Sequence, residues 1–336
     1  MKNGIYTLAN DLVYNQLVAL LNSIEVNAGK DLPVCVIAYN DQIDRIRAEV
    51  ASRNNVTLLE KSDIFARWEE FSLKVWQSHP TAIQSWEERG IKKFYRVSEN
   101  RRYCAFDSDS LFENFIYLDA DTLVMQPLDF IFEQLEHHDF VVYDFQYKDP
   151  AHIYNLQSPQ LLEVFSQQKI DSEIFCSGFY ASKRGIFTAQ QRDWLLSKLN
   201  AGESDVLYMS APNQSVLNYM RMRANVSFYN FAINLPPNKA TGCCVTSPHF
   251  ENRNYVLYDH GNRLTYLHYI GLSSKFFNRV CDGENIDFPY RDLFLHYRYL
   301  HQPEQRPKFT TKARAYNAPP SLTIRIFRKL GIKVEV

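Results

Sequence analysis

Two aspartates directly follow a short apolar run of the sequence. Phe115 to Leu118 is typical of a buried strand, and Asp119 and Asp121 come next, separated by one alanine. Side chains alternate along a strand, so both carboxylates point to the same side if the extended backbone continues through Ala120. Two neighbouring negative charges are costly unless a cation lies between them, and Mg²⁺ or Mn²⁺ prefers carboxylate oxygens. The pair predicts a divalent cation site; the alternative is an ordinary strand end with one capping aspartate.

Strands and helices alternate along the chain on both sides of this pair. The residue pattern predicts strands at 4–9, 33–39, 56–59, 115–118, 140–145 and 178–182. It predicts helices after residue 11, at about 41–52, between 63 and 102 with a break near 79–80, and at 214–220. This alternation indicates parallel βαβ units in a doubly wound sheet, in which ligands bind beyond the carboxyl ends of the strands.

The composition is that of an ordinary globular protein. Of 336 residues, 46% are hydrophobic and 22% are charged, which suits one large α/β domain or two smaller ones. The formal net charge of -1 argues against a general nucleic-acid binder, which normally has a basic face. Aromatic residues make up 14%, and we expect them to fill the core or to stack on bases or sugars.

The six cysteines contain no C-x-x-C pair, and Cys35 and Cys104 stand in apolar surroundings typical of buried free thiols. The sequence begins without a basic-then-apolar signal pattern. No run approaches the roughly 18 apolar residues of a membrane span. These features predict a cytoplasmic protein.

The C-terminal part of the chain is basic. Residues 291–336 hold ten Lys/Arg against three Asp/Glu, a charge of +7, which leaves -8 for the first 290 residues. After about residue 236, Pro, Gly, Asn and Cys cluster before a segment expected to be rich in strands. Within 321–332, apolar residues at helical spacing predict a basic amphipathic helix that could contact the inner face of an anionic membrane. The alternative is a terminal helix docked on the core of the protein.

Two classes of enzyme place D-x-D at the end of a strand. Aspartate-nucleophile phosphatases use D-x-D-G-T close to their N-terminus, but the loop glycine is missing from D-A-D-T-L in this sequence. Nucleotide-sugar glycosyltransferases are the other class, and three further stretches distinguish the two.

The order of four stretches resembles the GT-A glycosyltransferases, most of all the retaining branch (glycosyltransferase family 8-like) with glycogenin and bacterial lipopolysaccharide galactosyltransferases. The stretches are T-L-A-N-D-L-V-Y, Y-L-D-A-D-T-L-V, A-P-N-Q-S-V-L-N and Y-L-H-Y-I-G-L-S-S-K. The resemblance covers roughly residues 3 to 280. It implies a Rossmann-like, mixed and mainly parallel sheet flanked by helices, in a domain at 1–280 followed by a basic extension at 281–336.

The first stretch implies the nucleotide site. In the family, comparable residues hold the uracil and a nearby tyrosine stacks on the base. Thr7, Leu8, Asn10 and Tyr14 occupy these places, with a spacing one residue short. Ala120, between the two aspartates, is expected to lie at the same donor site.

The last stretch implies the third metal ligand. The family motif is H-x-x-G-x-x-K, in which His completes the metal site, Gly lets the backbone approach the diphosphate, and Lys neutralises it. His268 and Gly271 match this motif, and Lys275 comes one residue late. Mn²⁺ accepts one imidazole among oxygen ligands, so Asp119, Asp121 and His268 form a sensible set.

The third stretch implies the reacting face of the sugar. Gln214 matches the family's D-Q-x-x-L-N, but Asn213 replaces its acidic residue, so the donor sugar and the catalytic detail stay open. Arg102 is expected to contact the diphosphate or the sugar. Retention of configuration is implied by the resemblance, whereas an inverting enzyme would need an acid such as Asp144 or Asp205.

Together these features predict a Mn²⁺- or Mg²⁺-dependent transfer of a sugar from a UDP-sugar donor to a saccharide, lipid-linked or small-molecule acceptor. The alternative is a non-catalytic nucleotide-sugar-binding protein on the same fold.

Overall fold

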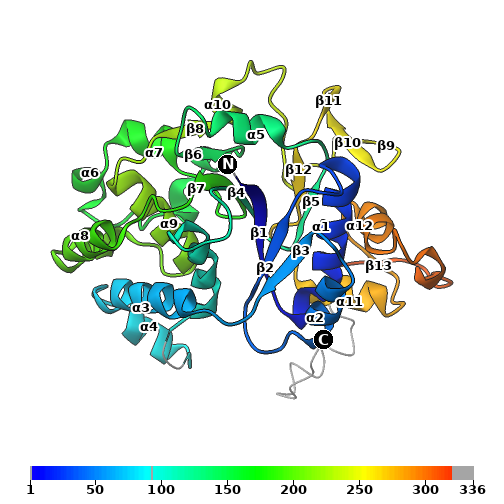
Figure 1. Ribbon diagram of the computed structural model, residues 1–336, viewed down its shortest axis with the longest axis horizontal. Coiled ribbons are helices and arrows are strands. Elements are labelled where there is room, and N and C mark those ends of the chain that lie inside the picture. Colours follow the sequence, from blue (N-terminus) through cyan, green and yellow to red (C-terminus); the bar gives the residue numbers. More distant parts are fainter. Residues whose placement is uncertain (1, 92–93, 320–336) are drawn as a thin grey trace.

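The computed structural model describes residues 2–91 and 94–319, and a seven-stranded sheet lies at its centre (Figure 1). The strands follow the order β3-β2-β1-β4-β7-β6-β8. Their bounds are β1 Asn3–Ala9, β2 Val34–Ala38, β3 Val56–Leu59, β4 Asn114–Leu118, β6 Phe140–Val142, β7 Phe179–Lys183 and β8 Phe228–Asn230. β7 runs antiparallel to β4 and β6, and the other neighbours are parallel. The predicted mixed, mainly parallel sheet is confirmed.

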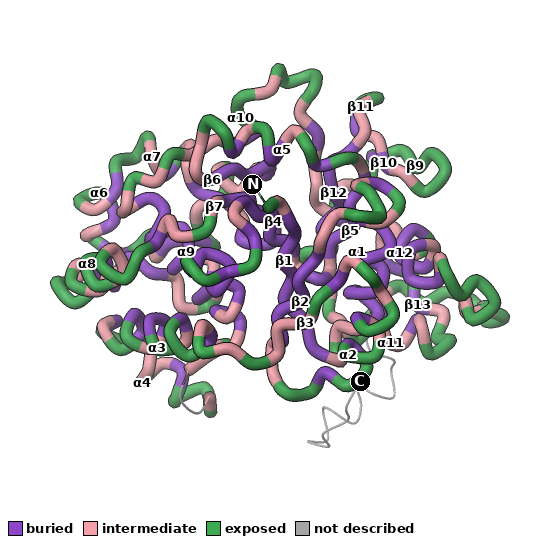
Figure 2. Tube along the Cα trace, in the orientation of Figure 1, coloured by how far each residue is buried: buried purple, intermediate pink, exposed green. Residues whose placement is uncertain are grey.

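The alternation of side chains in each strand divides the core into two layers. In β4, Phe115 and Tyr117 belong to one hydrophobic cluster. Ile116 and Leu118 belong to the cluster on the other face. Because both faces are apolar, helices cover both, and Figure 2 shows the buried sheet between partly exposed outer elements.

Helices on the two faces complete a three-layer arrangement. The Tyr117 face carries α3 Asp63–Gln77, α4 Ala82–Glu88, α6 Leu161–Val164, α7 Gln167–Glu173, α8 Ala189–Asn200, α9 Pro212–Arg223 and the 3-10 helix η2 Val97–Phe106. The other face carries α1 Tyr14–Asn27, α2 Asp44–Ala51, α5 Asp129–Gln134 and α10 Phe231–Asn234. Further 3-10 turns are η1 Asp11–Val13, η3 Gln146–Lys148, η4 Pro150–His152, η5 Glu203–Val206 and η6 Pro303–Gln305.

The break expected near residue 79 separates α3 from α4. His79 Nδ1 accepts hydrogen bonds from the backbone N–H groups of Thr81 and Ala82, 3.2 and 3.1 Å away, and so satisfies the start of α4. The last part of the predicted helical region, η2, is wound as a 3-10 helix rather than an α-helix.

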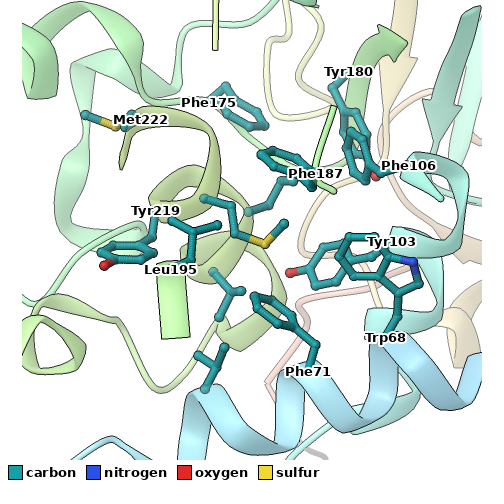
Figure 3. Close-up of a cluster of buried hydrophobic side chains, with 14 of the residues drawn as sticks. Trp68, Phe71, Tyr103, Phe106, Phe175, Tyr180, Phe187, Leu195, Tyr219 and Met222 are labelled. Carbon is teal, nitrogen blue, oxygen red and sulfur yellow. The ribbon is translucent and has the colours of Figure 1, made fainter. Parts of the chain in front are cut away.

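Aromatic side chains fill the layer between the sheet and the α3, α8 and α9 helices (Figure 3). Phe106 stacks on Tyr180 with ring centroids 5.7 Å apart and an angle of 4° between the planes. Tyr180 stacks on Tyr117 at 5.0 Å, and Phe187 meets Phe106 edge-on at 5.1 Å. The high aromatic content therefore serves largely as core, one of the two roles expected from composition.

The C-terminal third adds a second group of strands and two helices. β5 Thr122–Val124 pairs antiparallel with β12 Tyr266–His268. The other elements are β9 Glu251–Arg253, β10 Val256–Asp259, β11 Asn262–Arg263, α11 Ser274–Cys281, β13 Ile286–Asp287, α12 Arg291–Arg298 and β14 Arg314–Ala315. The prediction of a strand-rich tail is only partly right, because apolar residues at helical spacing in α11 and α12 pack into a third cluster.

The residues after 281 are tied to the first helix of the chain. Asn22 Nδ2 in α1 donates to the carbonyl of Tyr297 at 2.7 Å, and Asn27 Nδ2 donates to the Tyr297 hydroxyl at 2.8 Å. Leu293 and Leu295 share the third cluster with Leu123 of β5. The domain boundary at 280 stays a prediction. The amphipathic helix expected at 321–332 lies outside the described residues.

Cys35 and Cys104 are buried free thiols, as predicted. Burial raises the pKa of Cys35 to about 12, so this thiol stays protonated and inert at neutral pH.

Among the described residues, no helix has the length and apolar character needed to cross a membrane.

We expect Phe106→Ala to lower the free energy of unfolding by about 3–5 kcal/mol, because it removes a fully buried ring from the stacked cluster. Trp194→Ala is the control, since that ring is 39% exposed and its loss should change stability by about 1 kcal/mol or less. Urea unfolding followed by circular dichroism measures both. Equal losses for the two variants would contradict the assignment of the core.

Candidate active site

The two aspartates lie on a turn rather than on a continued strand. β4 ends at Leu118, and the backbone N–H of Thr122 donates to the carbonyl of Asp119 at 3.1 Å. The Thr122 hydroxyl donates to the same carbonyl at 2.7 Å. The expectation of extended backbone through Ala120 is therefore wrong, and this turn is what holds the two carboxylates near each other.

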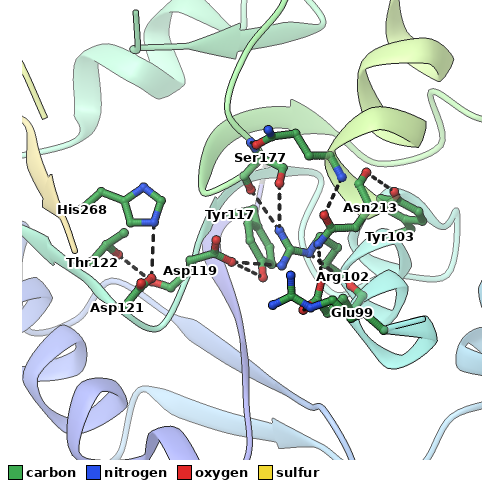
Figure 4. A network of polar contacts seen from close by, with 12 residues as sticks. Glu99, Arg102, Tyr103, Tyr117, Asp119, Asp121, Thr122, Ser177, Asn213 and His268 are labelled. Carbon is green, nitrogen blue, oxygen red and sulfur yellow. Dashed lines mark hydrogen bonds and ion pairs between the residues drawn. The ribbon is translucent and has the colours of Figure 1, made fainter. Parts of the chain in front are cut away.

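Pairing of β12 with β5 brings His268 to the aspartates (Figure 4). His268 lies opposite Thr122 in the register, and the next residue, Tyr269, donates its N–H to the carbonyl of Asp121 at 2.9 Å. His268 Nε2 lies 3.4 Å from Asp121 Oδ1. Three ligand atoms, one from each of Asp119, Asp121 and His268, lie within 4.8 Å of one another, so the three residues fit a divalent cation.

Gly178, which directly precedes β7, leaves the room that the imidazole needs. A Cβ atom on this residue would lie 2.3 Å from His268 Cε1. The Gly178 carbonyl accepts the backbone N–H of Asp119 at 2.9 Å, so this glycine contacts two of the three candidate ligands. Only a residue without a side chain fits here while His268 keeps its position.

The charge on His268 depends on Asp121. Burial alone would lower the pKa of His268, but the Asp121 carboxylate and the Cys176 thiol together raise that pKa well above its usual value. Without a cation, a proton on the imidazole balances the aspartates. A bound divalent ion would replace that proton, so metal and proton compete for His268.

Asp119 is held by a buried arginine. Arg102 Nη2 lies 3.1 Å from Asp119 Oδ1, and the Tyr117 hydroxyl donates to the same oxygen at 3.1 Å. The guanidinium also donates to the carbonyls of Ser177 and Glu99, both at 3.1 Å, and stacks over the Tyr117 ring. Although burial opposes the charge, Asp119 helps keep the pKa of Arg102 above its usual value. Arg102 therefore orients Asp119, and its expected contact with a diphosphate or sugar stays a prediction.

A cleft of about 720 Å³ opens beside these residues, at the carboxyl ends of β1, β2 and β4. The residues predicted for the donor that line it are Leu8, Asn10, Arg102, Ala120, Gln214 and Gly271. Gln214 is held in place, since its Oε1 accepts the N–H of Ser177 at 3.0 Å and its Nε2 donates to the carbonyl of His152 at 3.2 Å. Strand ends are the usual place for a ligand in an open α/β sheet.

Three predicted donor residues do not line this cleft. Thr7 is fully buried within β1. Tyr14 donates its hydroxyl to Glu49 at 3.1 Å and stacks against Arg45, 4.0 Å from the ring centroid. Lys275 is exposed and lines a neighbouring hollow of about 170 Å³. Their roles in donor binding stay predictions.

Two residues in the cleft were missed from the sequence. Tyr39 directly follows β2 and presents a half-buried ring to the cleft. Glu99 in η2 is buried; its Oε2 accepts from Asn213 Nδ2 at 2.8 Å, and its Oε1 lies 2.6 Å from Arg96 Nε. Burial raises the pKa of Glu99. The sequence held one signal for Glu99: it lies three residues before Arg102, and residues with this spacing lie on the same side of a 3-10 helix.

The acids considered for an inverting reaction lie elsewhere. Asp144 is buried and accepts the backbone N–H groups of Gln146 and Cys176 at 2.7 and 3.1 Å. Burial raises the pKa of Asp144 to about 7. Asp205 belongs to η5, and neither acid lines the described cleft.

No protein-family model and no curated protein matches this sequence. Among solved structures, the apo form of the bifunctional glycosyltransferase WbbM matches 91% of this chain at 13% identity and a TM-score of 0.50, and this chain spans 52% of the length of that one. Mouse xyloside xylosyltransferase 1 matches 68% of this chain and 85% of its own, at 9% identity and a TM-score of 0.48. The galactosyltransferase LgtC, solved with donor and acceptor sugar analogs, matches 82% of this chain and 94% of its own, at 15% identity and a TM-score of 0.48.

These structural neighbours are glycosyltransferases, and the predicted GT-A fold is confirmed. At these identities the likeness establishes the fold alone.

We expect Gly178→Ala to weaken Mn²⁺ binding by about 10-fold to 100-fold, because the new methyl group displaces His268. Electron paramagnetic resonance of the free ion measures the affinity. Gly185→Ala is the matched control. A Cβ atom added there meets nothing within 4 Å, so the affinity for Mn²⁺ should not change. The left-handed backbone of this residue (φ 76°) disfavours alanine, so the variant should lose only some stability. Unchanged affinity in Gly178→Ala would exclude His268 as a ligand.

Proposed function

We propose that this chain is a metal-dependent glycosyltransferase that uses a nucleoside-diphosphate sugar, with UDP as the nucleotide. The observation that carries the proposal is the convergence of Asp119, Asp121 and His268 at the mouth of a cleft, on a fold shared with glycosyltransferases.

Asp119, Asp121 and His268 would hold the cation. When bound, Mn²⁺ or Mg²⁺ supplies positive charge to the diphosphate that leaves during transfer. Arg102 keeps Asp119 in place, and Gly178 keeps the imidazole in place. Gly271, whose φ of 81° favours glycine, lets the backbone turn beside the cleft before Ser273 caps α11.

The part of the cleft next to the ends of β1 and β2 suits the base. Leu8 and Asn10 line it at the end of β1, and Tyr39 lines it at the end of the neighbouring strand β2. An aromatic face next to polar edges is what recognition of a pyrimidine needs. Tyr39 lines the cleft, whereas Tyr14 contacts Glu49 and Arg45, and this difference supports Tyr39 for the role.

Gln214 is the family-matched residue for the reacting face of the sugar. Its two hydrogen bonds to the backbone fix the side chain in the cleft, next to Ser177. The anomeric carbon would pass through an oxocarbenium-like state, with retention of configuration. The acceptor would be a saccharide, a lipid-linked sugar or a small molecule.

One observation favours a second candidate, a nucleotide-sugar-binding protein without turnover. Asn213 stands where the family has an acid; it lines the cleft, but its side chain is mostly buried and donates to Glu99 at 2.8 Å, so the cleft has no carboxylate at this position. Slow metal-dependent hydrolysis of a UDP-sugar favours the enzyme. Binding without any turnover favours this second candidate.

We expect the combined change Asp119→Ala with Asp121→Ala to lower the affinity for UDP in the presence of Mn²⁺ by about two orders of magnitude, or about 2.7 kcal/mol. The reason is that the ion joining protein and diphosphate is lost. Isothermal titration calorimetry with UDP, GDP and dTDP sugars, with and without Mn²⁺, measures this effect and identifies the base. Asp193→Ala, an exposed aspartate of α8, is the control. UDP binding that survives the double change would refute the proposed metal site.

We expect Tyr39→Leu to weaken UDP binding by about 1–3 kcal/mol, the usual contribution of one base stacked on an aromatic ring. Tyr14→Leu is the matched comparison, because it removes the tyrosine that the sequence suggested. Calorimetry on both variants decides which ring holds the base. A loss confined to Tyr14→Leu would refute the proposed role of Tyr39 and favour Tyr14.

A further inference from the structure

A second convergence of metal-binding side chains lies outside the cleft. His249, Asp259 and His260 each place one ligand atom within 4.8 Å of the others. His249 precedes β9, Asp259 ends β10, and His260 begins the turn into β11. We propose that these three residues form a zinc site, which we call the hairpin site.

The distances suit a small tetrahedral ion. His249 Nε2 lies 3.1 Å from Asp259 Oδ1, and His260 Nε2 lies 3.5 Å from the same oxygen. An ion about 2.0–2.1 Å from each ligand in tetrahedral geometry separates its ligand atoms by roughly 3.3 Å. Both imidazoles therefore already stand at ligand spacing from one carboxylate oxygen.

The carboxylate is oriented by its second oxygen. Asp259 is buried, and its Oδ2 accepts the backbone N–H of Gly242 at 2.7 Å, which leaves Oδ1 directed at the two histidines. The His249 ring packs edge-on against Phe250, with centroids 4.9 Å apart. A fixed outer shell of this kind is what holds metal ligands in position.

The ligand set separates this site from the cleft. Two imidazoles and one carboxylate suit zinc, whereas two carboxylates and one imidazole suit Mn²⁺ or Mg²⁺. The side chains of His249 and His260 are 52% and 83% exposed, so solvent water can complete the fourth position. The proposal of a zinc site at the hairpin site does not depend on the proposed transferase activity, because the two sites share no residue.

Zinc at the hairpin site would join two segments. His249 comes from the stretch before β9, and Asp259 and His260 come from the β10–β11 hairpin. The stretch before β9 also contains Cys243, whose carbonyl accepts the N–H of His268 at 2.7 Å. The ion would thus fix the backbone that supports β12.

The test uses the full chain carrying Asp119→Asn and Asp121→Asn, which removes two ligands of the cleft. After treatment with a chelator, this protein is titrated with Zn²⁺ against a chromogenic chelator, and separately with Co²⁺ while the visible absorption is recorded. We expect one tightly bound Zn²⁺ per chain and the intense visible bands of tetrahedral Co²⁺. Zn²⁺ should also raise the melting temperature.

Adding His249→Gln or His260→Asn should lower the affinity for Zn²⁺ at least tenfold and abolish the shift in melting temperature. Asn is chosen at residue 260 because it tolerates the left-handed backbone there (φ 46°), so the metal-free protein keeps its fold. His301→Gln is the matched control, since His301 is 54% exposed and has a carboxylate partner, Glu25 at 2.9 Å, but belongs to no such cluster among the described residues.

The absence of stoichiometric Zn²⁺ binding, or binding unchanged by His260→Asn, would overturn the proposal. An equal loss in His301→Gln would also overturn it, because the ion would then bind exposed histidines without preference.

Discussion

The antiparallel pairing of β5 with β12 is the interaction on which the candidate site depends. It joins the turn after β4 to a strand far downstream and sets His268 opposite Thr122, beside Asp121. The two strands pair over three residues each, and this backbone register brings the imidazole of His268 to the two carboxylates. A slip of one residue would turn His268 away from the aspartates.

The charged side chains around this pairing are held in place by oppositely charged partners. Asp119 is balanced by buried Arg102, and Asp121 by His268. Arg102 stacks over the ring of Tyr117, which in turn stacks on Tyr180, so the aromatic core and the polar site share residues. Removing one member of such a network leaves an uncompensated buried charge, which is more damaging than the loss of one hydrogen bond.

Much of the fold could be predicted from the sequence, because its information is local. The apolar run before Asp119 and the alternation of strands and helices are periodic patterns, and both were confirmed. The turn at Ala120 and the 3-10 winding of η2 were not predicted, since each depends on hydrogen bonds to particular neighbours. For the site, the motif resemblance placed His268 with the aspartates, while spacing alone could not. Tyr39 was missed because its position follows from tertiary packing and leaves no motif, and Glu99 was missed because its one signal, the spacing of three residues from Arg102, has meaning only once η2 is known to be a 3-10 helix.

The distance along the chain between β5 and β12 also has a consequence for synthesis. During translation the N-terminal strands can pair with one another early, but Asp119 and Asp121 must wait for β12 to leave the ribosome before His268 reaches them. Helix α12, bonded to α1, joins later still. A nascent chain that stops before residue 268 would therefore hold Asp119 through Arg102 and Tyr117 but leave Asp121 without its imidazole partner, and the complete ligand set arises only after β12 has been synthesised.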